Sequence, residues 1–136
     1  MKRRKQSRLK PPIEYRLLIS QKYDERNKKP TLSIVLHTTE EFHNFRYHIS
    51  VEEKIENNTI YLNILGLHPP KILLPGGGPA IYTKELLNLQ GTYTISISKH
   101  KEKQNTFIVN ISDRAITIIK SPQDKFVEIV TKQEDL

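Results

Sequence analysis

Cysteine is absent from the 136 residues, and this absence excludes several kinds of chemistry. Without thiols the chain can form no disulfide, no thiolate zinc site and no covalent intermediate on cysteine. The lack of disulfides fits a reducing compartment, so we expect a cytoplasmic protein. A long apolar window is also missing, and no apolar segment follows the basic N-terminus as a secretory signal requires. We therefore expect a soluble protein without a membrane span.

Helical periodicity is almost absent, because no segment repeats apolar residues at three-and-four spacing over three turns. Alternation of apolar and polar residues, which is typical of half-buried strands, recurs along most of the chain. Short alternating segments separated by turn residues predict an all-β sandwich or barrel. The alternating segments are residues 13–20, 31–38, 45–54, 59–67, 92–99, 106–112, 115–120 and 125–131. Periodicity leaves residues 81–90 open as either a strand or a helical turn.

Two neighbouring segments, 45–54 and 59–67, are predicted to pair as a hairpin. Asn57 and Asn58 lie between them, and asparagine tolerates the positive φ of a tight turn. Acidic residues gather near this turn, where we expect ordinary solvated surface. They are Glu52, Glu53 and Glu56.

The segment HPPKILLPGGGPA, residues 68–80, predicts a long crossover, with room for a short edge strand at 72–74. Its glycines invite comparison with phosphate-binding loops and oxyanion holes. A phosphate loop needs lysine and Ser or Thr where Pro79 and Ala80 stand, and the chain contains no G-x-S-x-G nucleophile motif. We expect a flexible connection where chain or partner backbone passes close. The candidate contact residues of this loop are Gly76, Gly77 and Gly78.

The run LNLQGTYTISISKH, residues 87–100, places Gly91 and Tyr93 at the start of an alternating strand. It resembles the tyrosine corner of immunoglobulin-like sandwiches, where glycine lets the chain cross between sheets and the tyrosine ring fills the end of the core. The hairpin that follows, with the charged loop KHKEKQN at 99–105, resembles the final strand pair of such a domain. The resemblance covers about residues 31–119 and implies an antiparallel immunoglobulin-like sandwich of about seven to nine strands. The Cys…Trp…Cys arrangement of antibody domains is missing, and a plain hairpin with a buried Tyr93 is the alternative.

Positive charge is concentrated at the N-terminus. Six cations precede Glu14, the first acidic residue, and subtracting these six from the net charge of +7 leaves +1 for the remaining chain. The sequence therefore predicts a disordered basic tail at 1–12 and one β-sandwich domain at 13–136. The six cations are Lys2, Arg3, Arg4, Lys5, Arg8 and Lys10.

Clustered cations of this kind stay solvated unless an anionic partner neutralises them. Nucleic acid is the commonest such partner, because each phosphate contact releases counterions without reading sequence. The stretch KRRK would also serve as a nuclear import signal in a eukaryotic or viral setting. A solubilising extension without a dedicated partner is the alternative.

Metal binding and catalysis find little support in the sequence. His37, His43 and His48 are the closest histidine trio, with acidic residues nearby, but surface histidines explain them more simply. No stretch combines a nucleophile, a base and an orienting group, so we expect no enzyme and no cofactor.

The sequence favours a non-enzymatic binding or assembly module that contacts a protein partner through its sheet edges, with the basic tail tethering it to an anionic partner. The alternative is a nucleic-acid-binding barrel of the oligonucleotide-binding type, which would need outward aromatics interleaved with basic residues. A small hydrolase built around the glycine loop is a third, weaker hypothesis.

Overall fold

Nine strands make up nearly all the regular structure of the computed structural model, which describes residues 13–69, 76–87, 89–100, 102–113 and 115–136. The all-β prediction and the number of strands are confirmed. Within the described residues no helix is long and apolar enough to cross a membrane. The elements are β1 (Tyr15–Asp24), β2 (Lys29–Phe42), β3 (His48–Glu56), β4 (Thr59–His68), β5 (Gly78–Leu87), β6 (Gly91–Lys99), β7 (Lys103–Ile111), β8 (Ile116–Lys120), β9 (Val127–Val130) and a 3-10 turn, η2 (Gln133–Asp135).

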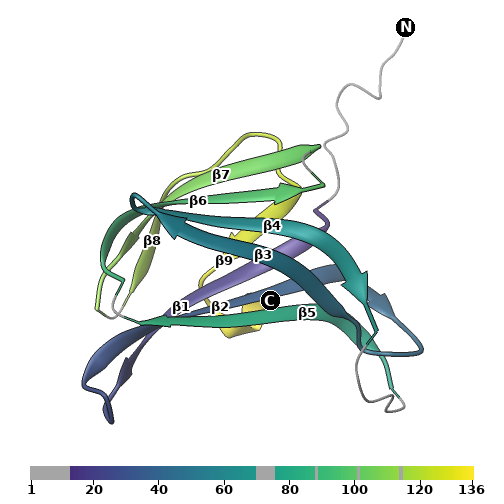
Figure 1. Cartoon of the computed structure of the whole chain (residues 1–136), viewed down its shortest axis with the longest axis horizontal. Helices are drawn as coiled ribbons and strands as arrows, with labels where there is room; N and C mark the ends of the chain where they lie inside the picture. Colours follow the sequence, from purple (N-terminus) through teal and green to yellow (C-terminus); the bar gives the residue numbers. More distant parts are fainter. Residues whose placement is uncertain (1–12, 70–75, 88, 101, 114) are drawn as a thin grey trace, which may run out of the picture.

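All nine strands belong to one mixed sheet with the order β8-β7-β6-β4-β3-β5-β2-β1-β9. Three neighbouring pairs are parallel, namely β1 with β9, β3 with β5 and β4 with β6. The sheet curls strongly into a half-barrel, so that β6 and β7 lie across the interior from β1 and β2 (Figure 1). The predicted antiparallel immunoglobulin-like sandwich is not confirmed, because hydrogen bonds join all the strands and some pairs are parallel.

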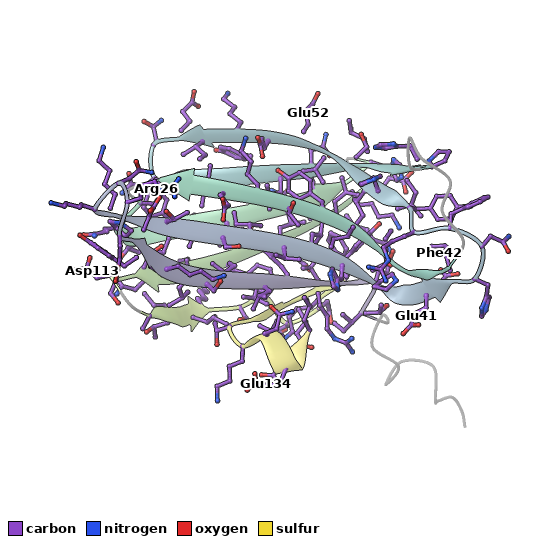
Figure 2. The ribbon with its side chains drawn as sticks, turned by 90° about the horizontal axis from the view of Figure 1, so that it is seen from below. Arg26, Glu41, Phe42, Glu52, Asp113 and Glu134 are labelled. Carbon is purple, nitrogen blue, oxygen red and sulfur yellow. The ribbon has the colours of Figure 1, made fainter. Side chains whose placement is uncertain are left out.

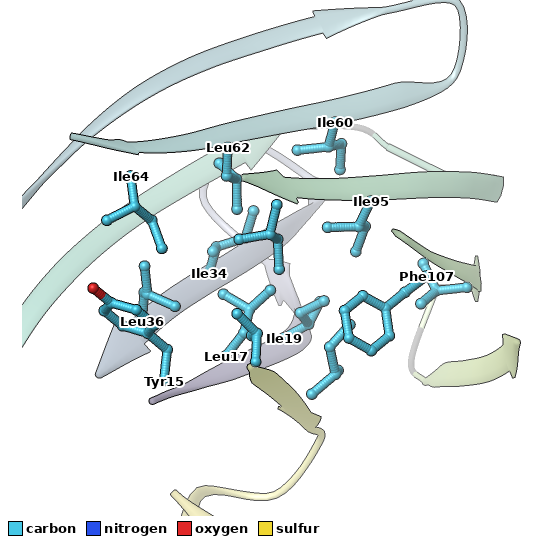
Figure 3. Close-up of a cluster of buried hydrophobic side chains, with 14 of the residues drawn as sticks. Tyr15, Leu17, Ile19, Ile34, Leu36, Ile60, Leu62, Ile64, Ile95 and Phe107 are labelled. Atoms are coloured by element: carbon cyan, nitrogen blue, oxygen red, sulfur yellow. The ribbon is translucent and has the colours of Figure 1, made fainter. Parts of the chain in front are cut away.

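The curled sheet has two halves, β8-β7-β6-β4-β3 and β5-β2-β1-β9, and the inward-facing residues of both form one core. Leu17 and Ile34 come from one half, and Leu62, Ile95 and Phe107 come from the other. Figure 3 shows these side chains pointing toward one another between the strands. Their alternation in the sequence correctly predicted the buried faces, since each strand presents every second residue to the interior. Tyr93 is half-buried and packs against this core, also as predicted.

The predicted hairpin is present as β3 and β4, but β3 begins at His48, so residues 45–47 of the predicted strand lie outside it. Asn57 and Asn58 form its two-residue turn with φ values of 52° and 59°, as a turn with two positive φ angles requires. The undecided residues 81–90 fall mainly in strand β5, whose Leu36↔Tyr82 pairing lies in an antiparallel ladder with β2. The edge strand suggested for 72–74 lies outside the described residues.

One buried side chain links β7 to the chain at the start of β9 by hydrogen bonds, across the open side of the half-barrel. The Asn105 side chain on β7 is 3% exposed. Its Oδ1 accepts the backbone N–H groups of Phe126 at 2.8 Å and Val127 at 3.1 Å. Its Nδ2 donates to the carbonyl oxygen of Asp124 at 3.0 Å. Asparagine 105 thus supplies, from its side chain, the bonds that a neighbouring strand would otherwise make.

Candidate functional site

The predicted tail site, Lys2, Arg3, Arg4, Lys5, Arg8 and Lys10, lies outside the described residues. The first described residue is Ile13, whose carbonyl oxygen accepts a hydrogen bond from the Thr39 hydroxyl at 2.7 Å. The point where the basic tail joins the domain is therefore fixed against β2.

The glycine loop packs closely on its own chain at Gly77 and Gly78, whereas a Cβ at Gly76 would meet nothing within 4 Å. A Cβ at Gly77 would lie 1.9 Å from the carbonyl oxygen of Phe42, so no other residue fits there without a shift of the backbone. Gly78 opens β5 with φ +147°, a conformation that glycine adopts readily. The Arg46 guanidinium lies beside it and donates to the Gly77 carbonyl at 3.5 Å. These contacts agree with the prediction of a close chain passage, whereas the loop's contact with a partner stays a prediction.

The histidine trio does not gather into a metal site. Among the described residues no three His, Asp or Glu side chains are grouped to hold a metal ion. Burial lowers the pKa of His37, and the positive charge of Arg46 lowers it further. His48 instead stacks on His68 of the paired strand, with ring centroids 5.6 Å apart.

The two halves of the sheet separate between β3 and β5. Within these strands the ladder consists of one pairing, His48↔Ile81, supported by a 3.1 Å hydrogen bond from the Ile81 N–H to the Tyr47 carbonyl. Beyond this pairing, β3 continues to Glu56 and β5 continues to residue 87 without a ladder between them. Their facing backbone edges are therefore not joined along most of their length.

A groove of about 270 Å³ opens where β3 and β5 diverge. Ile34, Ile60 and Leu62 form its floor, and each belongs to the core with at most 1% exposure. Leu86 and the 43% exposed Ile55 form its apolar walls. The groove lies slightly below the size of ordinary small-molecule pockets, which begin near about 300 Å³. Its apolar floor is suited to side chains of an extended peptide.

A polar bridge crosses the mouth of this groove. Glu53 on β3 pairs with Lys84 on β5, with Nζ and Oε1 2.8 Å apart, and it also accepts a hydrogen bond from the Tyr82 hydroxyl. Glu53 lies opposite Leu62, and Lys84 lies opposite Ile34, so both charges occupy core-facing positions of their strands. Glu53 is exposed, as expected for solvated surface, but its side chain also takes part in this ion pair.

The bridge keeps Glu53 ionised. Burial by itself would raise the pKa of this carboxyl group, but the hydrogen bonds from Lys84 and Tyr82 and the charge of Lys84 outweigh it, and the pKa is lowered. Burial and the neighbouring carboxylate raise the pKa of the Tyr82 hydroxyl. Tyr82 therefore remains a hydrogen-bond donor over the whole physiological pH range.

A second cavity, of about 470 Å³, lies at the end of the half-barrel beside Ile13. Glu14 there binds Lys99 at 2.5 Å and also binds Lys103. Lys99 additionally lies 5.6 Å from the centre of the Tyr15 ring. Burial opposes ionisation of Glu14, but the two lysines lower its pKa overall. This cluster ties the start of β1 to the β6–β7 hairpin.

Sequence reasoning missed the groove, although one signal was present. Glu53 interrupts the apolar face formed by Ile49, Val51 and Ile55. Lys84 likewise interrupts the apolar face between Tyr82 and Leu86. Inward-pointing charges on strands often mark edges that lack a neighbour.

In the described part of the chain, the groove between β3 and β5 combines an apolar floor with strand edges that do not pair, and it is the candidate functional site. No family model, no curated protein and no solved structure matches this chain.

Proposed function

We propose that the chain is a non-enzymatic binding or assembly module that takes an extended segment of a protein partner between β3 and β5. The observation that carries this proposal is the divergence of the two strands after His48↔Ile81, above an apolar floor. An extended segment placed there meets backbone hydrogen-bonding groups on both sides and core side chains beneath. Strand addition of this kind uses main-chain bonds for affinity and alternate side chains for selectivity.

The energetics favour an apolar segment. Each valine, leucine or isoleucine side chain that becomes fully buried contributes about 1.5–3 kcal/mol. Each net hydrogen bond along the strand edges adds about 0.5–1.5 kcal/mol. The charged bridge between Glu53 and Lys84 opposes entry only weakly, because partly exposed ion pairs are worth about 0–1 kcal/mol.

The basic tail is proposed as a tether to an anionic partner. Its six cations, Lys2, Arg3, Arg4, Lys5, Arg8 and Lys10, precede Ile13, which is anchored beside Thr39. Attraction of this kind acts over about 8–10 Å at physiological ionic strength and raises the rate of encounter. The tether and the groove therefore contribute in different ways, the tether through screened charge and the groove through apolar burial.

The fold-level resemblance to an immunoglobulin-like sandwich remains a proposal. It is supported by the single pairing that joins the two halves of the sheet and by the one core between them. Gly91 with φ +105° at the start of β6, and Tyr93 packed against the core, agree with a tyrosine corner.

Panning a displayed library of random twelve-residue peptides tests the groove. We expect enrichment of peptides with apolar residues at alternate positions, since only every second side chain of a strand faces the floor. Leu86→Trp fills the groove and Ile55→Asp makes its wall polar, so both should weaken the selected peptides about tenfold or more. Thr83→Trp on the exposed side of β5 is the matched control and should leave binding unchanged. Absence of enrichment, or equal binding by Leu86→Trp, contradicts the proposal.

Removal of residues 1–12 tests the tether against the nucleic-acid-binding alternative. We expect the full chain to bind single-stranded and duplex oligonucleotides without sequence preference. If all six cations contact duplex phosphates, the logarithm of affinity should fall against the logarithm of salt with a slope of about −5. A chain starting at Ile13, checked for folding by thermal melting, should lose most of this binding. Tight binding retained by the shortened chain would instead favour a nucleic-acid-binding barrel.

A further inference from the structure

We infer that the segment taken between β3 and β5 is an acidic strand that runs antiparallel to both, and that one of its carboxylates replaces Glu53 on Lys84 and Tyr82. This inference rests on the proposed function of the groove and adds the chemistry and direction of the partner.

The direction follows from the pairing at the closed end of the groove. β3 and β5 are parallel where His48 meets Ile81, so a strand between them has the same orientation toward both. Antiparallel ladders are somewhat more stable per residue than parallel ones. The partner strand therefore begins near Glu56, at the open end of the groove, and ends near His48.

The occupant is a different protein rather than a second copy or the chain's own tail. Inward-pointing charges on both edges discourage pairing with an identical edge, which would bring like charges together. The first twelve residues contain Met1 and Leu9 as their apolar side chains apart from two prolines, so they cannot provide alternate apolar positions. An external segment with apolar residues at alternate positions fits the floor.

The acidity of the partner follows from the two hydrogen-bond donors that lose their acceptor when a strand enters the groove. A strand that separates β3 from β5 breaks the contact of Glu53 with Lys84 and Tyr82. Two donors on β5, an ammonium group and a hydroxyl, then face the incoming strand. Glu53 has a side chain 35% exposed and can turn to water. A carboxylate on the partner satisfies both donors. The six cations of the tail also attract an acidic partner.

The first test measures the affinity of a library-selected peptide for Glu53→Gln. The amide removes the competing charge, and the ordinary cost of opening an ion pair, at most about 1 kcal/mol, corresponds to tighter binding of up to about fivefold. Glu52→Gln is the matched control. Glu52 is the preceding residue and points away from the sheet, where it accepts a hydrogen bond from Asn63 (Figure 2). Weaker binding by Glu53→Gln would overturn the inference.

The second test pans the same library against Lys84→Gln. Peptides selected on the natural sequence should carry an excess of Asp and Glu between their apolar positions, and this excess should be lost on Lys84→Gln. Lys120→Gln should keep it, because Lys120 is an exposed lysine on β8 that does not line the groove. Groove-dependent peptides without an acidic excess, or with the same excess on Lys84→Gln, would refute the acidic strand and leave the proposed function standing. Failure to select any groove-dependent peptide would refute both.

Discussion

Replacement of Asn105 by alanine is expected to lower the free energy of unfolding by about 3–5 kcal/mol. Three backbone groups, the N–H groups of Phe126 and Val127 and the carbonyl of Asp124, would lose their partner. Each buried polar group left unsatisfied costs about 1–3 kcal/mol. Urea unfolding followed by circular dichroism measures this loss, and a marginally stable chain would be largely unfolded at 25 °C.

The effect should be specific to the bridge between β7 and β9. Asn110→Ala changes the same residue type on the same strand, at a half-buried position, and should cost no more than about 0.5 kcal/mol. Asn105→Asp keeps an acceptor for the two N–H groups but loses the donor to Asp124, so it should be intermediate at neutral pH. If Asn105→Ala unfolds like Asn110→Ala, the side chain does not close the half-barrel.

Asn105 also shows where sequence reasoning fails. Its place in the charged loop KHKEKQN predicted a loop residue. β7 instead begins at Lys103, which places Asn105 inside a strand and 3% exposed. Its partners lie about twenty residues further along the chain, and nothing in the local pattern indicates that distance.

The faces of the strands were predictable because each is a local property. Ile95 and Ile97 alternate with serines and threonines, and both isoleucines are fully buried. The order of the strands was not predictable, since alternation tells which side of a strand is apolar but not which strand lies beside it. The parallel pairing of β4 with β6 is an example, because it joins segments separated by the whole of β5.

The candidate groove was predictable only as an anomaly in two strands. Glu53 and Lys84 lie 31 positions apart in the sequence, and each interrupts an apolar face. Either one alone is compatible with a solvated strand end. Their 2.8 Å contact becomes meaningful once β3 and β5 are known to be neighbours that share one pairing. The buried face of a strand could be predicted because it depends on local alternation. This site could not be predicted because it depends on which strands are neighbours.

Leu62→Ala is expected to be the second large perturbation, at about 3 kcal/mol, or a fall of about 10 °C in melting temperature. Leu62 on β4 is 1% exposed and points toward Ile34 and Ile95 in the shared core (Figure 3). Alanine leaves a space that neighbours from two halves of one curled sheet cannot both move to fill. Thermal melting of the full chain measures the change.

Leu65→Ala is the matched control, because it makes the same change three residues further along β4. Its side chain is 47% exposed on the outer face, so the expected loss is within about 0.5 kcal/mol. If both halves of the sheet share one core that includes Leu62, the loss of stability should be much larger for Leu62→Ala than for Leu65→Ala. Equal losses would mean that β4 does not present Leu62 to the interior, and the groove, whose floor includes Leu62, would then lack its apolar base.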